Sequence, residues 1–165
     1  MENSVSISDK DRAPSRPEER EELVRILFPD VDSTPTIAAL EAKYPLRQLP
    51  DGAKVVRVAP SPTGFVHIGT VFISVINRLL ASQSQGRFIL RIEDTDDKRE
   101  VAGGTAQIIR TLDMFSLHPD EGFVIQDGEV IETGAYGPYK QSERRSTYHA
   151  FAIELVRQGL AYPCF

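Results

Sequence analysis

The sequence lacks several features that define particular classes of protein. It has no tryptophan and one cysteine, Cys164, in 165 residues. A single cysteine cannot form an internal disulfide or complete a zinc site alone, which excludes a disulfide-stapled secreted domain and fits a reducing compartment. No apolar run approaches the roughly 18–20 residues of a membrane-spanning helix, and the polar N-terminus shows no secretory signal. We therefore expect a cytoplasmic protein without a membrane segment.

An excess of basic residues is also missing. The chain has 19 Lys and Arg against 24 Asp and Glu, a net charge of −5, which argues against binding nucleic acid through overall basicity but leaves a local basic patch open. No internal repeat or low-complexity tract is present. With 41% hydrophobic and 26% charged residues, the composition is that of a soluble globular protein of ordinary domain size.

The N-terminal third resembles an extension more than a core. Residues 1–17 are rich in Ser, Asp and Pro and are predicted to form a disordered tail. Helical spacing predicts short helices over 18–28 and from Thr34-Pro35 to Tyr44, with prolines at their ends. Residues 45–54 are interpreted as a surface linker. The predicted division is therefore a tail, a helical extension with linker over 18–54, and a main domain over 55–165.

Residues 55–70 are the stretch around which the main domain is organised. Val55, Val56 and Val58 are β-branched and favour a buried strand, which the prolines at 60 and 62 end. An apolar stripe then predicts a helix from about His67 to Gln85. A glycine in the first turn of a helix that follows a parallel strand allows a ligand to approach the backbone, and free N–H groups there favour phosphate.

The following segments predict a parallel sheet. Residues 87–92 read as a second buried strand, so strand, helix and strand form a βαβ unit. Helices are expected over 103–117 and 142–157. Residues 123–131, with Asp-Gly at the centre, predict a two-residue hairpin, interpreted as a small insertion.

Four kinds of side chain in this region suggest chemistry. His67 and Gly69 suit phosphate and nucleobase contacts, although His67 is equally well explained as a surface residue at a helix start. Arg57 lies in mid-strand and should meet a carboxylate, either of a substrate or of the acidic loop at 93–97. Glu93, Asp94 and Asp96 suit an ammonium group, a metal or the neighbouring arginines 91 and 99. Ser61 and Thr63 suit either ligand contacts or turn stabilisation.

Three motifs in order carry a resemblance to a known family. They are Arg57-Val-Ala-Pro-Ser-Pro-Thr-Gly-Phe-Val-His-Ile-Gly-Thr70, Arg91-Ile-Glu-Asp-Thr-Asp96 and Gly137-Pro-Tyr-Lys-Gln-Ser-Glu-Arg144. Together they resemble the N-terminal part of the catalytic domain of bacterial-type glutamyl-tRNA synthetases, which belong to class I. The resemblance covers about residues 55–165, and His67–Thr70 stands in the place of the class I His-Ile-Gly-His signature, with Thr70 replacing the last histidine.

The resemblance implies an α/β fold, a Rossmann-type (HUP-like) parallel sheet flanked by helices. It implies a glutamate–tRNA ligase that activates L-glutamate with ATP and Mg²⁺ and transfers it to tRNA-Glu, and we expect a monomer. By the same resemblance, Arg57 would contact the glutamate side-chain carboxylate, Ala59 and Ser61 would line the amino-acid site, and Glu93 would hold the α-ammonium. His67, Gly69 and Thr70 would form the catalytic signature, with His67 and Gly69 serving ATP.

Two departures and two alternatives accompany the resemblance. No Lys-Met-Ser-Lys-Ser-like loop and no anticodon-binding domain is present in the sequence, so we expect an incomplete sheet in an N-terminal fragment that is inactive alone. Cys164 lies where many family members begin a zinc-binding insertion; zinc is expected only in a longer parent, and a free thiol here. The alternatives are a glutamyl-queuosine tRNA-Asp synthetase and a non-catalytic nucleotide-binding fragment.

Overall fold

The structure is a computed structural model that describes residues 16–96 and 98–164. Most of the predicted disordered tail lies outside the described residues, but its last two positions belong to a helix: Arg16 is the N-cap and Pro17 the first residue of α1 (Pro17–Leu27). The described residues form two compact units, one made of residues 16–43 and 146–164 and the other of residues 44–145. The functional division at residue 54 stays a prediction.

The smaller unit is helical. It contains α1, the 3₁₀ turn η2 (Val31–Ser33), α2 (Ile37–Lys43) and α5 (Arg145–Arg157), which follows the 3₁₀ turn η3 (Ser142–Arg144). Helix α2 begins two residues later than Thr34-Pro35 predicts, because Thr34 closes the preceding turn on Val31 O and Thr36 Oγ1 instead accepts the Ala39 N–H.

The larger unit contains a four-stranded sheet. Its strands are β1 (Val55–Val58), β2 (Arg87–Leu90), β3 (Glu121–Gln126) and β4 (Glu129–Thr133), in the spatial order β1-β2-β3-β4. Strands β1 and β3 both pair with β2 in parallel, and β4 pairs with β3 in antiparallel fashion. The predicted βαβ unit is therefore confirmed.

The hairpin prediction is right in position but wrong in role. Asp127 and Gly128 both have positive φ angles, +54° and +86°, as a tight two-residue turn requires. However, β3 is not part of a separate insertion, because Ile89 and Leu90 pair with its first two residues. The hairpin extends the main sheet, because α4 connects β2 to β3 and β3 pairs in parallel with β2.

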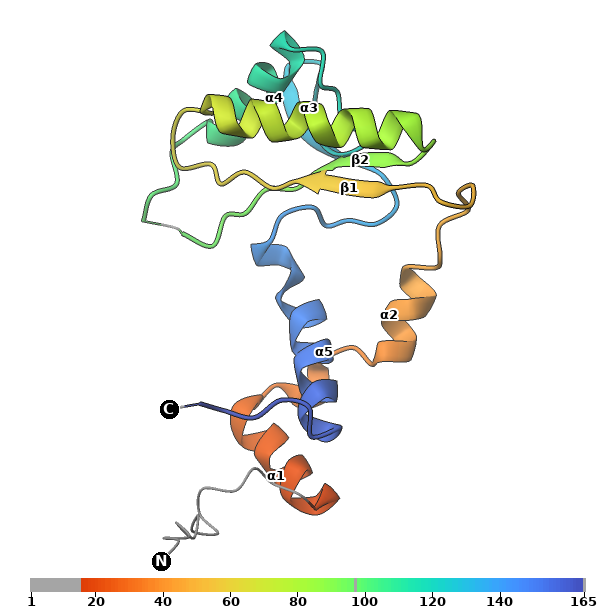
Figure 1. Ribbon diagram of the computed structural model, residues 1–165. Coiled ribbons are helices and arrows are strands. Elements are labelled where there is room, and N and C mark those ends of the chain that lie inside the picture. The colour runs from red at the N-terminus through yellow and green to blue at the C-terminus, as the bar shows by residue number, and fades with distance from the viewer. Residues whose placement is uncertain (1–15, 97, 165) are drawn as a thin grey trace, which may run out of the picture. The chain divides into compact units, whose positions relative to one another are not determined.

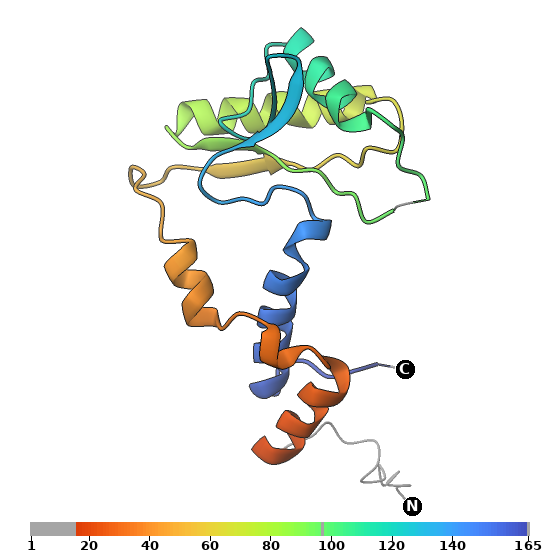
Figure 2. The same ribbon diagram turned by 180° about the vertical axis from the view of Figure 1, so that it is seen from behind.

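Two helices cover one face of the sheet. Figures 1 and 2 show α3 (Ile68–Gln83) and α4 (Gly104–Met114) on the same side of the strands, each between two consecutive strands of the chain. The core between these layers consists of fully buried apolar side chains, chiefly Phe88, Leu90, Ile108, Ile109 and Leu112. In the described residues, no helix has both the length and the apolar character needed to cross a bilayer.

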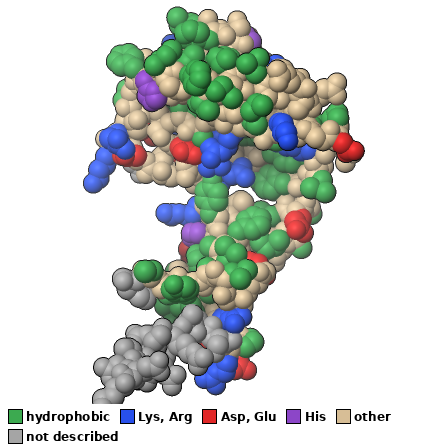
Figure 3. Space-filling view, viewed as in Figure 1, with side chains coloured by type: hydrophobic (Ala, Val, Ile, Leu, Met, Phe, Trp, Pro, Cys, Tyr) green, Lys and Arg blue, Asp and Glu red, His purple; other side chains and the backbone are tan. Residues whose placement is uncertain are grey.

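Helix α3 matches the predicted span, but most of its apolar stripe is not buried. Val71 is buried, whereas Ile73, Val75, Leu79 and Leu80 are exposed. Figure 3 shows hydrophobic side chains gathered over this helix. Apolar residues lie on the exposed face of this helix as well as on the face that packs on the sheet. The spacing of apolar residues therefore identified the helix but not its buried face.

Candidate active site

The loop between β1 and α3 forms one wall of a cavity of about 500 Å³. Its lining includes Ala59, Ser61, His67 and Thr70, four of the predicted site residues, together with Ile108 from α4. The loop is held in place from the α4 side: Pro62 is fully buried and its carbonyl accepts the Val101 N–H at 2.9 Å. A volume of this size falls in the range typical of small-molecule sites.

His67 stands at the start of α3 as its N-cap, with extended backbone angles and an exposed side chain. Its imidazole does not cap the helix, so the ring is available to a ligand. A Cβ at Gly69 would lie 3.0 Å from His67 Nδ1, which means that the ring occupies the space that the glycine leaves open. Thr70 is half-buried, and its N–H donates to His67 O at 3.0 Å. The three signature residues therefore form one local unit.

Arg57, in β1, and Glu93, three residues after the end of β2, lie close together. Arg57 Nη1 is 3.2 Å from Glu93 Oε1, and Arg91 Nη2 lies 3.6 Å from the same oxygen. The Arg57 side chain is 50% exposed. The apolar strand pattern suggested a buried guanidinium, but β1 lies at the edge of the sheet and leaves it half in solvent. The Glu93 N–H donates to Pro60 O at 3.1 Å, which brings this ion pair beside the loop that lines the cavity.

The remaining acidic side chains of this loop are engaged elsewhere. Asp94 is 4% exposed and accepts hydrogen bonds from Ser142 N at 2.9 Å and Ser142 Oγ at 2.5 Å, with Lys140 Nζ at 3.3 Å. Burial acts to raise the pKa of Asp94, but these hydrogen bonds outweigh it and hold the pKa below its ordinary value. Asp96 pairs with Arg99. Asp94 is thus an anchor for the segment before α5.

Reasoning from sequence missed this anchor and the residues around it. Lys140 and Ser142 belong to a motif that marks the resemblance, yet nothing in their spacing points to Asp94, 46 and 48 positions earlier. The segment also pairs with the end of β2: Ile92 N donates to Tyr139 O at 3.0 Å, and Gln141 N donates to Ile92 O at 2.9 Å. Long-range backbone pairing of this kind leaves no local signal.

The carboxylates of the acidic loop already have cationic partners. Among the described residues, no group of three His, Cys, Asp or Glu side chains is placed to hold a metal ion. Glu93, Asp94 and Asp96 all face cationic side chains, so their charge is already compensated. Cys164 is an exposed free cysteine.

A comparison with protein families identifies the larger part of the chain. The profile of the catalytic domain of class I tRNA synthetases (E and Q) matches residues 54–165. The chain belongs to this family. The prediction of the family from three motifs is confirmed, and the synthetase profile begins at the residue before β1.

Individual synthetases match over a longer stretch. The chain is 55% identical over 145 residues to a glutamate–tRNA ligase of Clostridium perfringens (strain 13 / Type A), covering 88% of this chain and 26% of that protein. A glutamate–tRNA ligase of Sorangium cellulosum (strain So ce56) is 47% identical over 152 residues, which covers 86% of this chain and 27% of the relative. Both aligned lengths exceed the segment 54–165, so the likeness reaches into the N-terminal extension. The chain spans about a quarter of the length of these curated relatives.

A solved synthetase shares the fold. The crystal structure of a glutamate tRNA ligase from Elizabethkingia meningosepticum in complex with its amino acid is 40% identical in sequence, with a TM-score of 0.52. The match covers 61% of this chain and 19% of that one. With the parallel sheet and its covering helices, this likeness confirms the predicted Rossmann-type α/β fold.

Proposed function

We propose that the chain carries the glutamate-activating half-site of a glutamate–tRNA ligase. The whole enzyme would join L-glutamate to ATP as glutamyl-adenylate, release pyrophosphate, and transfer the glutamyl group to the 3′ end of tRNA-Glu. The observation that carries the proposal is the Arg57–Glu93 pair beside the cavity that His67 lines. The reported relatives are glutamate–tRNA ligases, which favours this function over the glutamyl-queuosine alternative.

The charges of the pair match those of glutamate. Arg57 offers a planar guanidinium that binds a carboxylate through two hydrogen bonds, and Glu93 offers a carboxylate for the α-ammonium. In the structure these two groups form an ion pair with each other. A bound glutamate would replace each partner with one of its own charged groups, so the site exchanges one ion pair for two. Ala59 and Ser61, in the wall of the cavity, would contact the amino acid.

The His67 end of the cavity would bind ATP. An imidazole N–H there can donate to an α-phosphate oxygen whose charge grows as the glutamate carboxylate attacks. The open face of Gly69 accommodates the nucleotide once the His67 ring turns aside. Mg²⁺ would accompany the phosphates of ATP, because the carboxylates of the acidic loop already face Arg57, Lys140 and Arg99.

Calorimetry with a non-hydrolysable glutamyl-adenylate analogue tests the proposal. We expect binding to the wild-type chain and a loss of about 10- to 100-fold in affinity for Arg57→Ala, the cost of one or two charge-assisted hydrogen bonds. Arg78→Ala is the matched control, because Arg78 forms a comparable ion pair with Asp120 at 2.9 Å and neither residue is a predicted ligand of glutamate or ATP. Equal affinities for the wild type and Arg57→Ala would overturn the assignment of the glutamate site.

A further inference from the structure

The segment 44–47, which precedes the residues that the synthetase profile matches, is fixed to the loop 134–141. The two segments exchange hydrogen bonds in both directions: Tyr44 OH donates to Gly137 O at 2.7 Å, and Tyr136 OH donates to Pro45 O at 2.8 Å. The rings of Tyr44 and Tyr136 stack with their centroids 6.3 Å apart. Residues 45–54 were interpreted as a surface linker. Pro45 and Leu46 are exposed, in keeping with that interpretation, but the Arg47 side chain is only 18% exposed.

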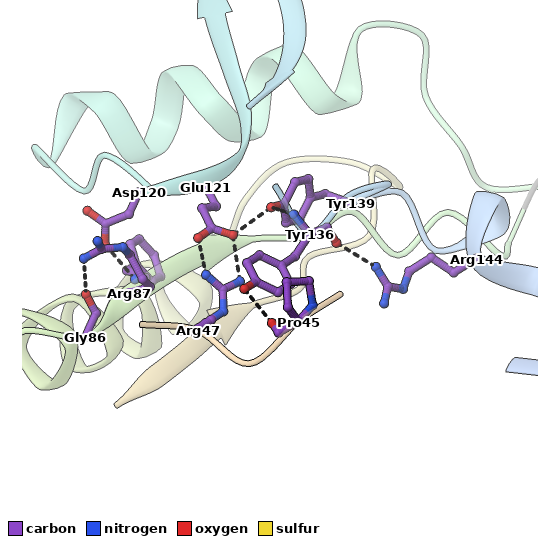
Figure 4. Close-up of polar contacts among 10 residues, drawn as sticks. Pro45, Arg47, Gly86, Arg87, Asp120, Glu121, Tyr136, Tyr139 and Arg144 are labelled. Carbon is purple, nitrogen blue, oxygen red and sulfur yellow. Dashed lines mark hydrogen bonds and ion pairs between the residues drawn. The ribbon is translucent and has the colours of Figure 1, made fainter. Parts of the chain in front are cut away.

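Arg47 is the central contact of this segment. Its guanidinium binds both carboxylate oxygens of Glu121, with Nη2 to Oε2 at 2.7 Å, and lies 3.7 Å from the centroid of the Tyr136 ring. Figure 4 shows the Arg47 guanidinium next to both the Glu121 carboxylate and the Tyr136 ring. Glu121 is 8% exposed at the start of β3. A carboxylate at this depth requires a cationic partner, because an unpaired buried charge costs several kcal/mol.

Glu121 connects Arg47 to the loop 134–141, because it also binds Tyr139. Tyr139 OH donates to Glu121 Oε2 at 2.7 Å, so one carboxylate binds both Arg47 and Tyr139. Tyr139 is buried, and its carbonyl accepts the N–H of Ile92, the residue directly before Glu93. A continuous series of polar contacts therefore runs from Arg47 through Glu121 and Tyr139 to the backbone of Ile92, the neighbour of Glu93.

We propose that Arg47 is a positioning residue, which fixes the loop 134–141 against the end of β2 through Glu121 and Tyr139 and so sets the place of Glu93. The part of this proposal that concerns Glu93 rests on the proposed function. Arg47 touches neither the cavity nor its predicted ligands, so its effect on binding is indirect. The extension thereby acquires a role in the site although it lies outside the matched catalytic segment.

Replacing Arg47 should weaken the contacts that hold the loop 134–141 in place. Removing Arg47 leaves the buried Glu121 carboxylate with Tyr139 as its remaining hydrogen-bond donor and removes the cation from the Tyr136 ring. Lysine at this position would keep the charge but lose the two-pronged geometry and the planar stacking. Arg47→Lys should therefore restore part, and not all, of what Arg47→Ala loses.

Hydrogen exchange of backbone amides tests the positioning directly. The amides of Ile92 and Gln141 bridge β2 and the loop, and we expect both to exchange about tenfold faster or more in Arg47→Ala. Arg47→Lys should give an intermediate rate, and the Arg78→Ala control the wild-type rate. Tyr136→Phe, which removes only the hydroxyl that binds Pro45, should raise both rates about threefold. The amide of Ile109, in the core helix α4, should keep its wild-type rate in all four variants.

Two results would overturn the proposal. Unchanged exchange at Ile92 and Gln141, or an equal rise at Ile109, would mean that Arg47 does not position the loop but at most stabilises the whole unit. In calorimetry with the glutamyl-adenylate analogue, Arg47→Ala should bind at least about fivefold more weakly, and unchanged affinity would refute the link to Glu93. Failure of the wild type to bind would refute the proposed function and that link together, while the exchange rates would still decide whether Arg47 fixes the loop.

Discussion

Replacing Asp94 by alanine should detach the segment before α5 from the end of β2. Asp94 is 4% exposed and binds the backbone and side chain of Ser142 as well as Lys140. A hydrogen bond to a charged group contributes about 1.5–3 kcal/mol. Ser142 is exposed and the Lys140 side chain is 34% exposed, so both can turn to water once the carboxylate is gone. The three contacts therefore do not add in full, and the expected loss for Asp94→Ala is about 2–3 kcal/mol.

Urea unfolding followed by circular dichroism measures this loss, with the exchange of the Ile109 amide as a probe of the unit that contains Asp94. Asp94→Asn keeps an acceptor for the Ser142 N–H but loses the charge, and should show roughly half the effect. Asp96→Ala is the matched control two residues away, because its pair with Arg99 is exposed and such pairs contribute little. If Asp94→Ala were no more destabilising than Asp96→Ala, the anchoring role of the buried carboxylate would be wrong.

Two further predictions concern charge and backbone space. The hydrogen bonds from Arg47 outweigh the effect of burial and hold the pKa of Glu121 below its ordinary value of 4.5. The stability that the ionised Glu121 carboxylate gives to the fold is therefore complete above pH 4.5 and is lost as the pH falls through the lowered pKa. Glu121→Gln should therefore make the free energy of unfolding less dependent on pH in acid, as urea melts at several pH values would show, and an unchanged slope would contradict this. Gly86→Ala should destabilise far more than Gly128→Ala, because a Cβ at 86 would lie 1.8 Å from a backbone carbonyl oxygen whereas one at 128 meets open space at a φ of +86°. Thermal melts compare the two variants, and equal shifts would refute the clash.

The elements that sequence predicted well have local causes. The β-branched run and the prolines after it define β1, and the Asp-Gly pair defines the hairpin between β3 and β4. The helix starting at His67 follows from apolar spacing over its whole length. The proximity of Arg57 and Glu93 also followed from topology, since parallel strands end at the same edge of the sheet.

The features that sequence missed depend on partners far away in the chain. Arg47 and Glu121 are 74 residues apart, and neither position carries a local signal for the other. The exposure of Arg57 depends on β1 lying at the edge of the sheet, which a single strand pattern does not reveal. The covered face of α3 is likewise decided by which elements pack on it and not by its own periodicity.

The pairing of α1 with α5 has a consequence for synthesis on the ribosome. Val24 is fully buried against Ile153 and Val156, and Glu21 pairs with Arg157 at 2.9 Å. The partners of α1 are thus made about 130 residues after it, which at translation rates of 5–20 residues per second is roughly 6–26 s. During that interval the buried contacts of Val24 with Ile153 and Val156 cannot form, while residues 44–145, which hold the four-stranded sheet, are synthesised. The four-stranded sheet can therefore form before the helical unit, whose packing has to wait for α5.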